Sequence, residues 1–231
     1  LFLPKDIELQ SNMQGNITAK WSPTQAITAD GELSISKGSI NVIDEYIDQQ
    51  VSQWSQGKLN FSLNEQHIQS HFSLYNKEQS PLLNMKATLA LTGDGIAEET
   101  CMSKLPLQAN IMLDQFNLQP FQSFIGGIVS LQGQVSSTMA IEGSIESPKV
   151  TGGITLKQGE LLLTGNPNRF NDITANINIV NNEAKIEGAL YLDDDKATVQ
   201  GELALDESLS FNIDINAEQL PLLFPPQLSV K

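Results

Sequence analysis

The residues in this sequence that could do chemistry are few, and two histidines are the first candidates. His67 and His71 are four positions apart, a spacing that on a helix puts both imidazoles on one face, where they could bind one metal ion. Ile68, Phe72 and Leu74 alternate with polar residues, however, which is typical of a strand. Four residues along a strand separate the histidines by about 13 Å, so we expect solvated surface histidines and no metal site.

Acidic clusters and a single cysteine are the next candidates. Asp193, Asp194 and Asp195 lack the central glycine and terminal glutamate of a calcium-binding loop, so we expect a solvated hairpin turn there, and an exposed loop at 98–99. Cys101 is the one cysteine, which excludes an intrachain disulfide and a cysteine-based zinc site. Its thiol is reactive only where the thiolate is stabilised, and Lys104 alone gives weak support for that.

Catalytic motifs and basic patches are both missing from the sequence. There is no nucleophile elbow, no phosphate-binding P-loop and no dinucleotide-binding glycine pattern, so we expect no enzyme and no cofactor. The chain has 231 residues, 13 basic and 27 acidic, for a formal net charge of −14, and Arg169 is the one arginine. Because phosphate binding needs clustered positive charge, this balance argues against a nucleic-acid partner.

Segments that would attach the chain to a membrane are not visible in the sequence. No stretch approaches the roughly 18 to 20 apolar residues that a spanning helix needs. The sequence begins at Leu1 without an initiator methionine or a basic-then-apolar leader. We therefore expect a segment of a longer protein.

Alternation of apolar and polar residues dominates the chain and predicts half-buried strands. Short polar connections, such as Asn181-Asn182, Asp193 to Asp195, 206–208 and 92–95, separate the alternating runs. Short connections join antiparallel neighbours, so the prediction is an all-β antiparallel meander with one wet face. The runs lie at 17–21, 33–36, 40–42, 59–63, 68–74, 85–91, 107–113, 150–156, 173–179, 186–192, 199–205 and 211–215.

Two short stretches change to helical spacing, which predicts one helix over 43–54 and another over 118–125. Pro120 suits the first turn of the second helix. We expect both to be short caps or plugs on a sheet. The apolar residues in question are Ile43, Ile47, Val51 and Trp54, and Leu118, Phe121, Phe124 and Ile125.

An internal duplication divides the sequence into a first β repeat unit over 1–117 and a second, continuous with it, over 118–231. Glycines give the strongest match, because alternating sequences also align by chance. Repeats joined end to end predict an extended structure in which each unit packs on its neighbour. The matched glycines are Gly15 with Gly133, Gly31 with Gly152, and Gly38 with Gly159; Ile68 matches Ile186, and 85–91 matches 199–205.

The apolar face of these strands has two interpretations that the alternation does not separate. It could be a closed core, as in a β-sandwich or barrel. It could instead line a curved sheet whose inner face is partly covered, which leaves a long apolar groove.

The second unit also contains a motif that resembles a known family. Residues 143–152 are GSIESPKVTG, followed by alternating strands around Gly159, and LQGQV at 131–135 and LPLL at 220–223 also fit. This pattern resembles the G-[ST]-x-x-x-P-x-[LV]-x-G repeat of the TamB family, AsmA-like proteins of Gram-negative bacteria. The resemblance covers about 118–231; the first copy lacks the motif over 22–31.

The resemblance implies a fold, a function and partners. The implied fold is a U-shaped, hydrophobic-lined sheet called a β-taco, in the periplasm, in a protein anchored in the inner membrane. The implied role is transport of phospholipid between the inner and outer membranes, or help in the assembly of outer-membrane proteins, with the outer-membrane barrel subunit TamA as partner. Acyl chains would occupy the groove, for which the candidate residues are Ile17, Leu33, Ile35, Ile40, Phe61, Phe72, Leu89, Ile111, Val135, Ile154, Leu156, Leu161, Ile177, Leu190, Leu203 and Ile213.

Two other functions remain open from the sequence. An open sheet edge could pair with nascent strands of outer-membrane barrels and help them to assemble. Alternatively, the segment is a structural spacer with a closed core.

Overall fold

The chain is built of antiparallel β-strands, as the alternation predicts. A computed structural model describes residues 7–43, 48–91, 101–124, 127–165, 167–192, 194–205 and 210–217. In these ranges the helical elements are two short 3₁₀ helices, η1 (Met102–Lys104) and η2 (Gln119–Phe124). The strands are β1 (Ile7–Gln10), β2 (Met13–Ser22), β3 (Gln25–Ile35), β4 (Gly38–Ile43), β5 (Asp48–Trp54), β6 (Gln56–Leu63), β7 (His67–Tyr75), β8 (Pro81–Ala90), β9 (Pro106–Asn117), β10 (Ile128–Ser144), β11 (Pro148–Leu163), β12 (Arg169–Val180), β13 (Glu183–Leu192), β14 (Asp195–Ala204) and β15 (Phe211–Ala217).

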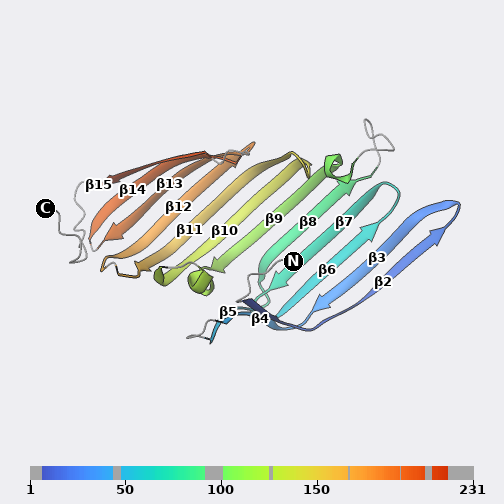
Figure 1. Cartoon of the computed structure of the whole chain (residues 1–231), viewed down its shortest axis with the longest axis horizontal. Coiled ribbons are helices and arrows are strands. Elements are labelled where there is room, and N and C mark those ends of the chain that lie inside the picture. Colours follow the sequence, from blue (N-terminus) through green and yellow to red (C-terminus); the bar gives the residue numbers. More distant parts are fainter. Residues whose placement is uncertain are drawn as a thin grey trace. The chain divides into compact units, whose positions relative to one another are not determined.

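Two sheets contain these strands (Figure 1). A 12-stranded open sheet has the order β15-β14-β13-β12-β11-β10-β9-β8-β7-β6-β3-β2, and a 3-stranded sheet has the order β1-β4-β5. Consecutive strands are neighbours, except that β1, β4 and β5 lie in the small sheet, so β1 is not next to β2, β3 is not next to β4 and β5 is not next to β6. The predicted meander is therefore confirmed, with one detour.

By density of contacts the chain forms two compact units. Unit 1 contains Leu1–Asp114 and Thr138–Thr151, and unit 2 contains Gln115–Ser137 and Gly152–Lys231. Because β10 and β11 each contribute to both units, the units are not consecutive halves of the chain. The repeat boundary between 117 and 118 stays a prediction.

In unit 1, the small sheet continues strands of the large sheet after short polar breaks. Ser11 and Asn12 separate β1 from β2, Ser36 and Lys37 separate β3 from β4, and Ser55 separates β5 from β6. The order β1-β4-β5 in the small sheet therefore repeats the order β2-β3-β6 in the large one.

Hydrogen bonds join the first two breaks and extend to the small sheet. The backbone N–H of Ser36 donates to the Asn12 carbonyl at 2.9 Å, and the Asn12 N–H donates to the Ser36 hydroxyl at 3.2 Å. The indole Nε1 of Trp54 donates to the Ser36 carbonyl at 3.0 Å, and Trp54 is 6% exposed. These bonds pair backbone groups that would otherwise be left open where the strands are interrupted.

The helix predicted over 43–54 is wrong. Asp48–Trp54 is strand β5, which pairs with β4 from Ile43 opposite Asp48 to Gly38 opposite Trp54. Pairing with a neighbouring strand outweighs a weak helical periodicity, because local preference is a small term beside tertiary contacts. Residues 44–47 lie outside the described part of the chain.

The second predicted helix is present as a short 3₁₀ element. In η2, the Phe121 N–H donates to the Leu118 carbonyl at 2.8 Å, the i to i+3 bond of a 3₁₀ helix. The ring of Phe121 lies 5.4 Å from that of Phe116. Neither this element nor 43–54 is a cap on a sheet in the described residues, so the expectation of helical caps is not met.

The hairpin at Asn181-Asn182 is confirmed. Val180 and Glu183 are paired across it, and Asn181 and Asn182 have φ angles of 50° and 71°. Positive φ at both central residues is the mark of a type I′ turn, which asparagine tolerates. Of the other predicted turns, 92–95, 206–208 and Asp193 lie outside the described residues, whereas Asp195 pairs with Leu192 as β14 begins.

The left-handed backbone of this hairpin leads to a stability prediction. We expect Asn182→Ala to lower the free energy of unfolding by about 1 kcal/mol, because a side chain with a Cβ is strained at positive φ and alanine gains no compensating local hydrogen bond. Asn182→Gly should cost less, since glycine adopts this conformation freely. Urea unfolding of the three proteins measures the difference; an equal loss in both variants would show that the asparagine side chain, and not the backbone, matters here.

Matched glycines of the predicted duplication occupy comparable positions in the two units. Gly38 pairs with Trp54 and Gly159 pairs with Ile173. In both pairs a Cβ on the glycine would collide with the partner residue. Gly38 begins β4 of the small sheet and Gly159 lies within β11 of the large one, so the duplication stays a prediction.

Other matched positions keep or lose register. Leu89 pairs with Leu107 on β9, and its matched residue Leu203 pairs with Phe211 on β15. Ile68 pairs with Leu89, but the residue paired with Leu203 is Ala184, two positions before the predicted counterpart Ile186. The connection that closes this pair of strands, between Leu192 and Asp195, is shorter than the connection between β7 and β8 in unit 1.

Candidate functional site

The candidate site in unit 1 is one face of the large sheet. Residues paired directly across antiparallel strands point to the same face, so the register defines its members. They are apolar or glycine except for Ser70. From β2 to β9 they are Met13, Gly15, Ile17 and Ala19; Ala29, Gly31, Leu33 and Ile35; Gly57, Leu59, Phe61 and Leu63; Ile68, Ser70, Phe72 and Leu74; Leu83, Met85, Ala87 and Leu89; Leu107, Ala109, Ile111 and Leu113.

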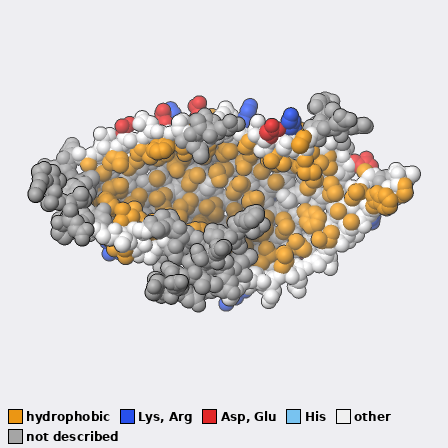
Figure 2. Space-filling view, viewed as in Figure 1, with side chains coloured by type: hydrophobic (Ala, Val, Ile, Leu, Met, Phe, Trp, Pro, Cys, Tyr) orange, Lys and Arg blue, Asp and Glu red, His pale blue; other side chains and the backbone are white. Residues whose placement is uncertain are grey.

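This face is only partly covered by the described residues. Its large side chains, such as Leu33 and Phe72, are half-buried, and Met85 is 38% exposed. Residues that line the inside of a closed sandwich are largely buried. Figure 2 shows hydrophobic side chains spread over this face and charged side chains at its margin. The described residues therefore do not close a core here.

Glycines allow large side chains to lie across the face of unit 1. A Cβ on Gly31 would collide with the ring of Phe61, its partner on β6. A Cβ on Gly57 would lie 3.1 Å from Cδ1 of Leu74 and 3.2 Å from Cβ of Ile35. An aromatic ring that covers a cross-strand glycine gives the sheet a smooth apolar surface.

Unit 2 has an apolar face of the same kind. β-Bulges interrupt β11 between Leu156 and Gly159 and β12 between Asn171 and Thr174. The residues of positive φ there are Gln158 and Asp172, at 52° and 45°. Each bulge inserts a residue without turning the next apolar residue to the other face. The face contains Gly152, Ile154, Leu156, Gly159 and Leu161; Phe170, Ile173, Ala175, Ile177 and Ile179; Ala184, Ile186, Gly188, Leu190 and Leu192; Ala197, Val199, Gly201 and Leu203; Phe211, Ile213 and Ile215.

The predicted groove residues lie on these two faces, with two exceptions. Val135 is half-buried on β10. Ile40 is in β4, in the small sheet, and its side chain lies outside the described part. The alternation also runs through Leu59, Met85, Val199 and other face residues that the prediction left out, although the same signal marks them. In unit 1 the face holds Ile17, Leu33, Ile35, Phe61, Phe72, Leu89 and Ile111, and in unit 2 Ile154, Leu156, Leu161, Ile177, Leu190, Leu203 and Ile213.

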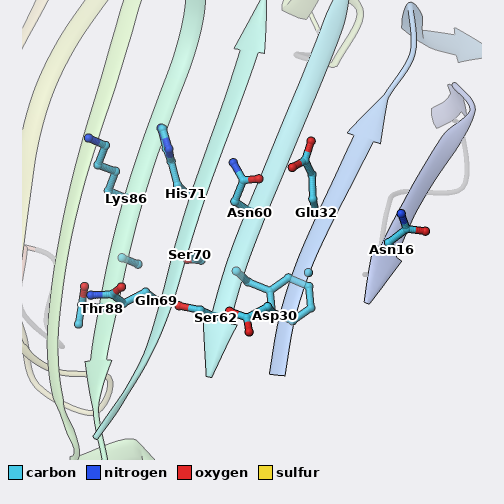
Figure 3. Close-up of a pocket in the computed structure, with 13 residues that line it drawn as sticks. Asn16, Asp30, Glu32, Asn60, Ser62, Gln69, Ser70, His71, Lys86 and Thr88 are labelled. Carbon is cyan, nitrogen blue, oxygen red and sulfur yellow. The ribbon is translucent and has the colours of Figure 1, made fainter. Parts of the chain in front are cut away.

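The opposite face of unit 1 is polar and holds an open hollow of about 620 Å³. Two rows of side chains flank it across β3, β6, β7 and β8 (Figure 3). An ion pair of 2.8 Å between Lys58 Nζ and Glu32 Oε1 joins β6 to β3 beside it. The rows are Glu32, Asn60, His71 and Lys86, and Asp30, Ser62, Gln69 and Thr88.

The two histidines lie in hydrogen-bonded surroundings on this polar face. The Asn84 amide nitrogen is 3.1 Å from His71 Nε2 and donates to the Ser73 hydroxyl at 3.1 Å. His67 Nε2 is 3.2 Å from the Asn64 amide nitrogen. Both imidazoles are half-buried, so the expectation of solvated histidines understated their contacts. No group of three metal-ligating side chains occurs among the described residues.

A family comparison identifies the chain. The model of the TamB N-terminal domain matches residues 1–156, which is more than half of the 231 residues. The chain belongs to the TamB family. The matched range includes the whole first repeat unit (1–117), where the sequence motif is diffuse. It ends within β11, in the second repeat unit. Membership places this TamB-family chain among proteins that serve the biogenesis of the Gram-negative cell envelope. No curated protein and no solved structure matches it.

Cys101 of the TamB-family chain has a neighbour that the sequence analysis missed. The Ser103 hydroxyl donates to Sγ at 3.3 Å, and this bond holds the pKa of the Cys101 thiol below its ordinary value, with a smaller contribution from the Ser103 backbone. Cys101 is the N-cap residue of the short helix η1, and Ser103 lies within that helix. Lys104, the neighbour that the sequence suggested, is a lesser cause.

Long apolar helices are missing from the described part of this TamB-family chain. None of its helices has the length and hydropathy needed to cross a bilayer. The one arginine, Arg169, pairs with Glu160 at 3.2 Å.

Proposed function

We propose that this TamB-family segment is a non-enzymatic, periplasmic lipid conduit whose apolar sheet face binds the acyl chains of phospholipids in transit between the inner and outer membranes. The observation that supports the proposal is the half-exposed apolar face of unit 1, which runs without a charged residue across β2, β3, β6, β7, β8 and β9. Contiguous exposed apolar surface is rare on proteins that have no apolar partner.

Acyl chains fit this surface energetically. Each methylene that leaves water gains about 0.8 kcal/mol, so a chain of many methylenes has ample drive to occupy it. A uniform apolar surface keeps burial nearly constant as the lipid moves, so no deep minimum traps it. Head groups would stay in water, since the sole arginine is engaged with Glu160 and the chain has a net charge of −14.

Curvature of the sheet into a groove is part of the proposal. Bulges at Gln158 in β11 and Asp172 in β12 bend the strands and increase local twist. A sheet that curves toward its apolar face would enclose an acyl chain on more than one side. We further propose that other parts of the parent protein anchor it in the inner membrane and that TamA is its outer-membrane partner, as in the family it belongs to.

Lipid binding is tested by native mass spectrometry of the purified chain and by photo-cross-linking with a labelled phospholipid. We expect co-purified phospholipid, with Ile35→Asp in unit 1 and Leu156→Asp in unit 2 each lowering occupancy, because a carboxylate in an apolar contact is costly to desolvate. Ser34→Asp is the matched control, since Ser34 is next to Ile35 on the polar face opposite Lys58. Absence of both bound lipid and cross-links in the unaltered chain would refute the proposal.

A second candidate function is assembly of outer-membrane barrels by strand pairing. The observation that favours it is the edge strand β2, which is exposed along nearly its whole length. An unfolded barrel strand could add to this edge through main-chain hydrogen bonds. Site-specific cross-linking to an unfolded barrel protein at β2, and not at face residues such as Phe72, would support it; the reverse pattern would exclude it.

A further inference from the structure

The hollow on the polar face of unit 1 is bounded by strands that are paired on both sides. Its two rows of side chains come from β3, β6, β7 and β8, and each of these strands lies between two neighbours inside the large sheet. The backbone there is engaged in the sheet, so a ligand in the hollow would be recognised by side chains. The volume of about 620 Å³ is typical of a small-molecule site.

Opposite charges lie at the two ends of this hollow. Lys86 on β8 is at one end, and Asp30 and Glu32 on β3 are at the other (Figure 3). Glu32 is paired with Lys58. The side chains of Lys86 and Asp30 form no ion pair and no hydrogen bond with any residue that the structure describes. Charges on adjacent strands can pair with each other, but β6 and β7 separate these two.

Neutral polar side chains fill the interval between the charged ends. Three interstrand spacings separate β3 from β8, which is about 14 Å. Asn60 and Ser62 on β6 and Gln69 on β7 lie between them (Figure 3). Their amide and hydroxyl groups both donate and accept hydrogen bonds. The backbone of a peptide has the same two kinds of group at every residue, and four extended residues span about 14 Å.

The cationic end of the hollow has a second hydrogen-bond donor. His71 is directly opposite Lys86 on the neighbouring strand. The Asn84 amide nitrogen, which can only donate, is 3.1 Å from His71 Nε2, so Nε2 accepts and Nδ1 carries the proton. Within the described residues, Nδ1 has no hydrogen-bond partner. A carboxylate held by Lys86 therefore has a neutral N–H donor beside it.

A phospholipid on the apolar face cannot place its head group in this hollow. The hollow and the apolar face lie on opposite sides of the same paired strands, so a head group would have to pass through the sheet. The charges of the hollow therefore fit a separate, water-soluble molecule.

We propose that the hollow binds a short zwitterionic peptide of about four residues, with its terminal carboxylate at Lys86 and His71 and its terminal ammonium at Asp30. The peptide lies across the strands, and the neutral polar side chains bond to its amides. This inference is independent of lipid binding, which uses the other face of the sheet.

NMR titration of the isotope-labelled whole chain with tetra-alanine tests the proposal, because it gives both the place and the dissociation constant of a weak complex. We expect the side-chain amide signals of Asn60 and Gln69 to shift. N-acetyl-tetra-alanine lacks the ammonium group, and tetra-alanine amide lacks the carboxylate. Each capped peptide should bind about fivefold more weakly than tetra-alanine, as expected for the loss of one exposed charge pair.

Two variants identify the end that each charge binds. Lys86→Gln should bind tetra-alanine about fivefold more weakly than the unaltered chain and should no longer distinguish it from its amide, while it still discriminates against the N-acetyl peptide. Asp30→Asn should show the reverse pattern. Lys20→Gln and Asp114→Asn are the matched controls, because both residues are exposed on strands of unit 1 but do not line the hollow. Circular dichroism checks that all four variants fold.

Three results would each overturn the proposal. The first is the absence of shifts at Asn60 and Gln69 with millimolar tetra-alanine. The second is equal binding of tetra-alanine and of the peptide capped at both ends. The third is an equal loss of affinity in Lys86→Gln and Lys20→Gln, because a general effect of net charge would then explain the binding.

Discussion

Phe72→Asp is expected to lower the phospholipid occupancy of the chain at least about tenfold, because a carboxylate placed in an apolar contact costs several kcal/mol when it loses water. Phe72 is in the middle strand of a cross-strand row in which each residue directly faces the next, from Leu33 and Leu59 to Met85 and Ile111. A charge there interrupts the apolar face of unit 1 at its centre. Native mass spectrometry of lipid-loaded protein gives the occupancy.

Gln69→Asp is the control for this change. Gln69 is on the same strand but on the polar face, opposite Ser62 and Thr88, so it should leave lipid occupancy near that of the unaltered chain. Phe72→Leu keeps an apolar side chain at the central position and should retain most of the lipid. Equal loss in Phe72→Asp and Gln69→Asp would mean that net charge, and not the apolar face, governs binding.

Gly159→Ala is expected to destabilise unit 2 by about 2 kcal/mol, which is typical of an extra methyl group forced into a packed site. The new Cβ would lie 2.7 Å from Cβ and 2.9 Å from the carbonyl oxygen of Ile173. The backbone oxygen of β12 moves only if the strand pairing opens. Urea unfolding followed by circular dichroism measures the loss.

Gly153→Ala is the matched control on the same strand. Its Cβ would meet only the Ile177 carbonyl oxygen, at 3.7 Å, an ordinary contact, so stability should stay the same or rise slightly. Gly38→Ala should resemble Gly159→Ala, since a Cβ there collides with Trp54 and with Gln10. If Gly159→Ala were as stable as Gly153→Ala, the close packing of Gly159 against Ile173 would not matter to the fold.

The strands, their antiparallel order and the apolar face could be predicted from the sequence because side chains alternate strictly along a strand. The two-residue spacing of Leu59 and Phe61, for example, is enough to place both side chains on one face of the sheet. The Asn181-Asn182 hairpin was also predictable, since few residues tolerate its backbone. Whether described residues close over the face was not predictable, because a covered and an open face need the same alternation.

The split of unit 1 into two sheets could not be predicted either, because one spacing of residues along the sequence is compatible with two structures. Ile35 and Gly38 are three residues apart, and so are Leu156 and Gly159. At the first position the strand breaks and a new sheet begins, whereas at the second a bulge keeps one strand continuous. The same local spacing thus has two outcomes, and the choice rests on neighbouring strands, where Trp54 reaches the break at Ser36.

The three breaks that connect the small sheet to the large one also have a mechanical consequence. Each of β1, β4 and β5 is tied to its own strand of the large sheet by only one or two residues, so three short covalent tethers lie abreast. A force that pulls the small sheet along its strands is divided among the three tethers. One tether can therefore lengthen only when the other two lengthen with it. The small sheet therefore resists being drawn away as a unit, while a tilt about the line of tethers requires rotation at only a few backbone bonds.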